Sequence, residues 1–189
     1  SEWNEVFNKG IPPGLNIHKL KIIPRLIIAL VRELALSVTR DSIFFDSPLN
    51  EDGIRQANEL CETLRERYGS TGSKGDGVLL SAGSRSVVVV SNLRRAIETV
   101  CLCLRDRLDA AGKGDPEQVV MHSGLQEISR NIDTMALAPK GGVPAMPKLG
   151  AALRGSFDLA TRFECSTNAG NKPLRGTGLT RMTSFLEWA

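Results

Sequence analysis

The chain of 189 residues is long enough for one domain with a sizeable core, and 41% hydrophobic and 24% charged residues are ordinary values for a globular protein. A net charge of +3 is too small and too dispersed to indicate nucleic-acid binding, and the few aromatic residues argue against base stacking. The most apolar segment has no uncharged run longer than Leu26 to Val31, far short of the roughly 20 residues of a membrane span.

The sequence contains four cysteines, Cys61, Cys101, Cys103 and Cys165, and two histidines, His18 and His122. Their spacing matches no metal-binding pattern, so we expect neither a zinc site nor another metal or cofactor. Cys61, Cys101 and Cys103 fall within helical patterns, where a thiol acts as a small hydrophobe. The pattern predicts free thiols and a reducing, cytoplasmic location.

Two helices are expected in the first half of the chain. Residues Ile22 to Val38 carry an apolar stripe at helical spacing, with Pro24 tolerated in the first turn. This helix is expected to be buried or to form a lid, with partner binding as a minority alternative. The second helix runs from an N-cap at Asn50 to about Tyr68, and the acidic residues after Asn50 complement its dipole.

Four consecutive valines, Val87 to Val90, predict a strand that is buried on both faces, as in parallel sheets covered by helices. The polar pair Ser91-Asn92 then turns the chain and caps a helix that extends to about Leu108. A second buried strand, Val119 to Met121, completes a strand–helix–strand order that indicates a parallel sheet.

Arg94 and Arg95 occupy the first turn of the helix after the valine strand, where positive charge is unfavourable for the helix dipole. Ligands of open α/β sheets bind at the carboxyl ends of the strands, and two cations beside helix N–H groups suit a phosphate. An equally weighted alternative is that both arginines are solvated or paired with Glu98 or Asp106.

The last third of the chain shows weaker patterns. Pro139 to Pro147 is a proline- and glycine-rich loop that could cover a site, and Phe157 to Gly178 is expected to be irregular. Thr180 is expected to cap a final helix. The apolar face of that helix would comprise Met182, Phe185, Leu186 and Trp188.

Four motifs follow one another along the chain: Ser1-Glu2-Trp3-Asn4, the helix start Asp46 to Ala57, the segment Ser91 to Thr99 with its Arg95-Ala96 pair, and Leu125-Gln126-Glu127. In this order and spacing they resemble the phosphoglycerate-mutase-like branch of the histidine phosphatase superfamily. The similarity covers Ser1 to about Thr134, and only weakly Thr180 to Ala189. It implies a three-layer α/β sandwich with a mostly parallel central sheet and helices on both faces.

The resemblance also implies a mechanism. In that family a histidine attacks the phosphoryl group, two arginines and a second histidine hold its oxygens, and an acidic residue protonates the leaving oxygen. By position, Glu127 matches the catalytic acid and Arg95 the phosphate-holding arginine. Ser1 and Asn4 belong to the motif of the phosphate pocket. Arg94 is a further candidate for phosphate binding, although we expect it to point outward.

Several departures from the family pattern qualify this interpretation. The Arg-His-Gly-Glu motif would stand directly before Ser1, and the second histidine would follow Trp188, so we expect a single domain (1–189) truncated at both ends. His18 does not match the family context, and His122 is expected to be structural. Ile128-Ser129-Arg130-Asn131 after Glu127 argues against 3-phosphoglycerate as substrate, so a phosphatase is at least as well supported as a mutase.

Three hypotheses therefore compete. The first is a phosphohistidine-dependent phosphoryl-transfer enzyme acting on a small phosphorylated metabolite, with this chain inactive without its nucleophile. The second is a non-catalytic phosphate-binding or scaffold protein of the same fold. The third, a general nucleotide-binding α/β domain, is disfavoured because no glycine-rich loop follows a strand. A homodimer is left open, and neither nucleic acid nor membrane is expected as a partner.

Overall fold

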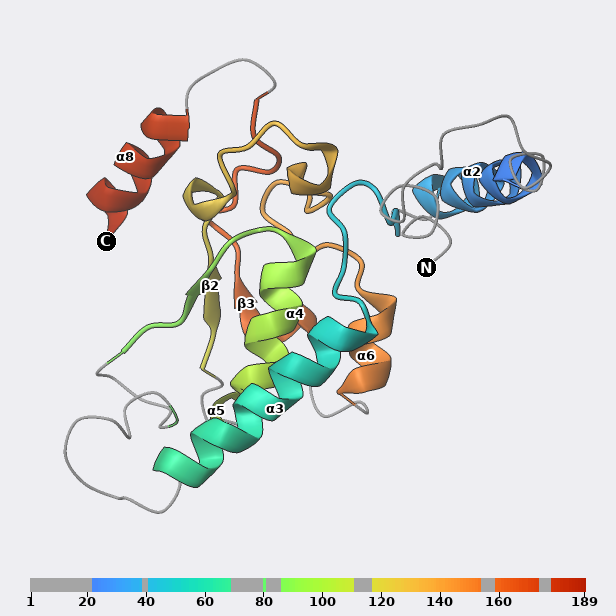
Figure 1. The fold of residues 1–189 in the computed structure, drawn as a ribbon. Coiled ribbons are helices and arrows are strands. Elements are labelled where there is room, and N and C mark those ends of the chain that lie inside the picture. Colours follow the sequence, from blue (N-terminus) through green and yellow to red (C-terminus); the bar gives the residue numbers. More distant parts are fainter. Residues whose placement is uncertain are drawn as a thin grey trace. The chain divides into compact units, whose positions relative to one another are not determined.

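A computed structural model of the chain describes residues 22–38, 41–68, 80, 86–110, 117–153, 159–173 and 178–189. The chain divides into two compact units, Ser1–Ile43 and Phe44–Ala189. Helix α2 (Ile22–Val38) is the described helix of the first unit. All other described helices and strands belong to the second (Figure 1).

Helix α2 has the bounds expected from its apolar stripe. The buried Glu33 anchors the segment after the helix, because its carboxylate accepts hydrogen bonds from the Ser42 hydroxyl and from the Ile43 backbone N–H (3.1 Å). Many apolar side chains of α2 are exposed, namely Leu26, Ile27, Ile28, Leu30, Val31 and Leu34. Its role as a lid stays a prediction. Among the described helices, none has the length and apolar character to cross a membrane.

A parallel sheet forms the centre of the second unit. Its strands are β1 (Val89–Val90), β2 (Val119–Met121) and β3 (Phe163–Glu164), in the order β1-β2-β3 (Figure 1). Both pairings are parallel, with Val89 opposite Val120 and Val119 opposite Phe163. This confirms the expected α/β class with a parallel sheet.

The valine strand is shorter and less buried than expected. Val88 and Val90 are buried, but Val87 is 67% exposed, so burial on both faces is wrong for this position. The reason is that sheet pairing begins only at Val88, whose carbonyl oxygen accepts a hydrogen bond from the Val120 N–H (2.9 Å). Val87 precedes this bond, so it is not paired in the sheet and its side chain stays exposed.

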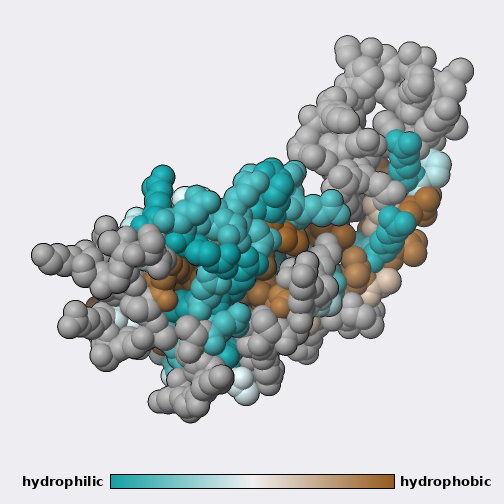
Figure 2. Space-filling view, turned by 90° about the horizontal axis from the view of Figure 1, so that it is seen from below, coloured by the Kyte–Doolittle hydropathy of each residue, from teal (hydrophilic) through white to brown (hydrophobic). Residues whose placement is uncertain are grey.

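Helix α3 (Glu51–Tyr68) confirms the second predicted helix and its cap. The Asn50 side-chain oxygen accepts a hydrogen bond from the Gly53 N–H (2.7 Å), which satisfies one of the free donors of the first turn. Its buried residues are Ala57 and Cys61, and the helix packs against α4. Seen from below, the described surface of this unit is largely hydrophilic, with smaller hydrophobic patches between the polar residues (Figure 2).

The helix expected from Ser91 to about Leu108 is divided in two. Helix α4 (Arg94–Cys103) ends at Leu104, whose backbone leaves the helical conformation, and α5 (Arg105–Ala110) follows. The expected Ser91-Asn92 cap is wrong: Leu93 is the N-cap residue and makes no side-chain capping bond. The buried Asn92 side chain donates instead to the Asn168 side-chain oxygen (3.1 Å) and the Gly170 carbonyl oxygen (2.8 Å).

Two residues expected in an irregular region form the third strand. Phe163 of β3 is buried, and the short helix α7 (Leu159–Arg162) precedes it. The remaining elements are η3 (Ser123–Leu125), η4 (Ile132–Thr134), α6 (Pro147–Ala152) and α8 (Gly178–Trp188). Helix α8 begins two residues before the expected cap at Thr180, and its Met182 and Leu186 side chains are exposed.

Arg65 of α3 binds Asp106 of α5 through two parallel hydrogen bonds of 2.9 and 2.8 Å. These bonds lower the pKa of Asp106 below its usual 3.8, so their stabilisation is present above that value and is lost as the pH falls through the lowered pKa. We expect Arg65→Gln to lower the free energy of unfolding only slightly at pH 7, because both partners are partly exposed. Urea denaturation at pH 7 and pH 2 should show a smaller effect of the substitution at pH 2.

Candidate functional site

The carboxyl ends of the three parallel strands lie at one end of the sheet, here called the carboxyl edge. Because β1, β2 and β3 are parallel, the segments that follow them emerge on the same side. These segments are Ser91 to Arg95, His122 to Glu127 and Cys165 to Lys172. Arg95 and Glu127, two of the candidates marked from the sequence, therefore lie on segments that meet at this edge.

Arg95 and Glu127, which are 32 residues apart in the sequence, meet at this edge. The Arg95 guanidinium donates a hydrogen bond of 2.6 Å to the Glu127 carboxylate. It also donates to the backbone oxygen of Asp133 (2.8 Å), and the Asp133 carboxylate lies 3.7 Å away. The side chains of Arg95 and Glu127 are 29% and 47% exposed, so a solute can reach both.

Arg94 does not share this position, and the expectation that it points outward is wrong. Its side chain is fully buried, and the guanidinium donates to the backbone oxygens of Asp46 (2.7 Å) and Phe45 (3.2 Å). Neighbouring helix residues point in directions about 100° apart, so Arg94 faces the interior while Arg95 faces the edge. Arg94 thus holds the segment before α3 and is not brought to the Arg95–Glu127 pair.

Asp46 connects three segments and was not singled out from the sequence. Its carboxylate accepts hydrogen bonds from the backbone N–H groups of Arg94 (2.8 Å) and Leu137 (2.8 Å), so it caps α4 from 48 residues away. Asp46 is fully buried and has a positive φ of 51°. Burial raises the pKa of this carboxyl group, and the hydrogen bonds and the Arg94 charge oppose that rise.

Lys172 fixes the loop that carries Glu127 and Asp133. Its buried ammonium group donates to the backbone oxygens of Glu127 (2.8 Å) and Ser129 (2.5 Å) and to the Thr134 hydroxyl (2.6 Å). All three donors of the ammonium group are therefore used. The loop from 127 to 134 is tied to the segment after β3, which gives Glu127 a defined place beside Arg95.

His122 is packed as a structural histidine, as expected. Its Nδ1 accepts a hydrogen bond from the Gly124 N–H (2.9 Å), and its ring lies 5.2 Å from that of Phe185 and 5.3 Å from that of Trp188. Burial lowers the pKa of His122 and so favours the neutral ring.

The remaining candidates from the sequence, Ser1, Asn4 and His18, lie outside the described residues. Asp106, which could have paired with one of the two arginines, binds Arg65 instead. Within the described part of the chain, no group of three or more His, Cys, Asp or Glu side chains is arranged to hold a metal ion.

Comparison with protein-family models, with curated proteins and with solved structures found no match for this chain.

Proposed function

We propose that this chain is part of a phosphoryl-transfer enzyme, a phosphatase or phosphomutase of the histidine phosphatase type acting on a small phosphorylated metabolite. The supporting observation is the pairing of Arg95 with Glu127 at the carboxyl edge of a parallel sheet. These two residues were assigned to phosphate binding and acid catalysis from separate motifs. We further propose that the complete fold is a three-layer sandwich with helices on both faces of the sheet.

In this proposal Arg95 binds the phosphoryl group and neutralises charge that develops during its transfer. Its planar guanidinium offers paired N–H donors that match two phosphate oxygens. In the structure these donors bind the Glu127 carboxylate and the Asp133 backbone oxygen. A bound phosphate would take them over and leave the Glu127 carboxyl group next to the transferred group, where a general acid has to lie.

The proposed reaction needs a histidine nucleophile, which the resemblance to the histidine phosphatase family implies within an Arg-His-Gly-Glu motif. Activity is therefore expected of a chain that carries this motif. The alternative, a non-catalytic phosphate-binding protein, is favoured by the placement of His122, which is the one histidine among the described residues and is held by Gly124 and two aromatic rings. Both proposals predict phosphate binding at Arg95, but only the enzyme proposal predicts turnover.

Replacing Glu127 by glutamine tests the acid role. In a chain that carries the upstream motif, Glu127→Gln should slow hydrolysis of alkyl phosphates by roughly 10²-fold or more and affect nitrophenyl phosphate least. A good leaving group departs without a proton, whereas an alkoxide does not. Steady-state hydrolysis of a series of phosphate esters with different leaving groups measures this dependence.

Glu59→Gln serves as the control, because Glu59 pairs with Arg55 at an exposed position of α3, outside the segments of the carboxyl edge. It should leave the dependence on the leaving group unchanged. An equal loss across all esters with Glu127→Gln would argue that Glu127 only orients Arg95. Phosphate binding without turnover in the wild-type chain with the upstream motif would favour the non-catalytic alternative.

A further inference from the structure

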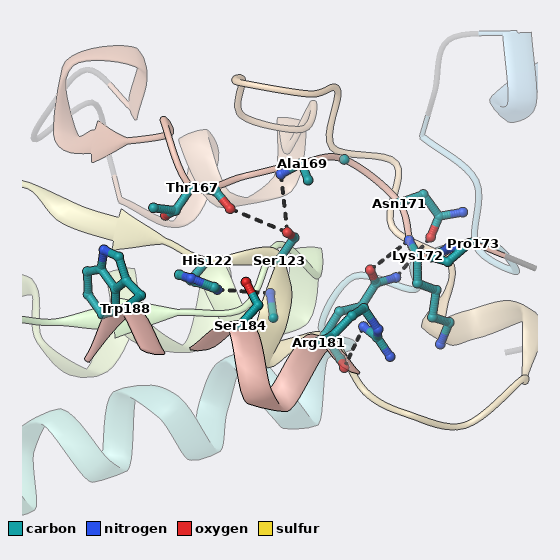
Figure 3. A pocket seen from close by; sticks show the side chains of 13 residues that line it. His122, Ser123, Thr167, Ala169, Asn171, Lys172, Pro173, Arg181, Ser184 and Trp188 are labelled. Atoms are coloured by element: carbon teal, nitrogen blue, oxygen red, sulfur yellow. Dashed lines mark hydrogen bonds between the residues drawn. The ribbon is translucent and has the colours of Figure 1, made fainter. Parts of the chain in front are cut away.

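A cavity of about 380 Å³ lies beside the loop that carries Glu127, between the carboxyl ends of β2 and β3 and helix α8 (Figure 3). This volume is within the range of small-molecule sites. The side chains that matter for its chemistry are those of His122, Lys172, Arg181, Ser184 and Trp188. In Figure 3, Arg181 and Lys172 lie at one end, and His122 and Trp188 lie at the other.

The cavity is positively charged. Lys172 and Arg181 line it, and none of its described lining residues is acidic. The Arg181 guanidinium donates to the backbone oxygens of Gln126 (3.0 Å) and, weakly, Glu127 (3.5 Å), and Lys172 likewise bonds to neutral oxygens. Partly buried cations that lack a carboxylate partner favour a bound anion. Burial and the Arg181 charge lower the pKa of Lys172, while the more weakly acting charges of Glu127 and Asp133 raise it, and burial lowers the pKa of Arg181.

Hydrogen-bond donors accompany this charge. Only part of the Arg181 guanidinium is used in the two bonds to the loop, so other N–H groups stay available. Because His122 accepts at Nδ1, the hydrogen of its neutral ring lies on Nε2, which has no acceptor among the described residues. The Ser184 hydroxyl of α8 also lines the cavity. These groups can donate to the oxygens of an anion.

Trp188 provides a flat apolar wall. Its ring packs near those of His122 (5.3 Å) and Phe185 (5.9 Å), yet the residue is 41% exposed. An aromatic or other flat group can therefore contact it. A ligand with an anionic group and a ring would satisfy both ends of the cavity.

The cavity is separate from the Arg95–Glu127 pair. Neither residue belongs to its lining, and the charge of Arg95 is already balanced by Glu127 and Asp133. The Glu127 backbone lies between the two places, because its side chain binds Arg95 while its carbonyl oxygen accepts from Lys172.

We propose that this cavity is a second anion-binding site, which takes a small organic phosphate or carboxylate with its anionic group on the unused donors of Arg181, beside the positive charge of Lys172, and with its ring against Trp188. The site does not depend on phosphoryl transfer at Arg95.

The fluorescence of Trp188 reports occupancy of the cavity directly. The sequence has two tryptophans, so Trp3→Phe leaves Trp188 as the single emitter. Titration of this variant with phenyl phosphate or benzoate should give a saturable change in emission. Arg181→Gln in the same background should raise the Kd at least about tenfold, because it removes both a charge and donors.

Ser184→Asp provides a second variant that does not alter buried structure, since Ser184 is exposed on α8. The added negative charge should also weaken binding, while Arg130→Gln, on an exposed residue outside the cavity, should not. Absence of a saturable signal with both ligands would overturn the proposal. It would equally fail if Arg95→Ala abolished the signal and Arg181→Gln did not, because the anion would then bind at the Arg95–Glu127 pair.

Discussion

Replacing Arg95 by alanine should reduce kcat/KM for phosphate esters in a chain that carries the upstream histidine motif. The reduction should correspond to a loss of about 2–4 kcal/mol of transition-state stabilisation. The change removes the guanidinium that faces the carboxyl edge and leaves Glu127 and Asp133 as unneutralised carboxylates at the place where phosphate is proposed to bind. The loss of the guanidinium charge and the repulsion by the two carboxylates both weaken phosphate binding. Steady-state kinetics should therefore show a higher KM together with a lower kcat.

Two further variants make this result specific. Arg95→Lys retains the charge but loses the planar pair of donors, so its loss should lie between those of the wild type and of the alanine variant. Arg55→Ala removes an exposed arginine of α3 that pairs with Glu59 and should leave kinetics unchanged. If Arg95→Ala hydrolysed nitrophenyl phosphate at the wild-type rate, Arg95 would not be the phosphate ligand.

Local sequence signals predicted those parts of the fold that depend on neighbouring residues. The cap at Asn50 and the acidic residues after it set the start of α3 where it was expected. The valine run and Val119–Met121 form parallel strands, and parallel strands place their carboxyl ends together. Arg95 and Glu127 each follow one of these strands, so the rule places both at the same edge.

Contacts between distant segments could not be predicted in this way. The sequence gives no sign that Asp46 caps a helix 48 residues later, since a polar turn and a buried linker look alike. Strand β3 has only two residues, too few for a periodic pattern. The choice between Arg94 and Arg95 depends on the rotation of α4 about its axis, which the bond between Asp46 and the Arg94 N–H helps to fix.

This network around Asp46 leads to the largest effect on stability that we expect. Asp46→Ala should lower the free energy of unfolding by about 3–5 kcal/mol, because it leaves the Arg94 and Leu137 N–H groups without an acceptor in a buried place, at about 1–3 kcal/mol each. Alanine is also less suited than aspartate to the positive φ of 51° at this position. Urea denaturation monitored by circular dichroism measures the loss.

Asp46→Asn separates these contributions. Asparagine tolerates the left-handed backbone and keeps one side-chain oxygen, so it can accept from only one of the two N–H groups and should lose less stability than alanine. Asp52→Ala, at an exposed position of α3, is the control and should change stability little. Equal stability of the wild type and Asp46→Ala would mean that other contacts position α4 and the loop at Leu137. The orientation of Arg95 would then have to be explained without the Asp46 cap.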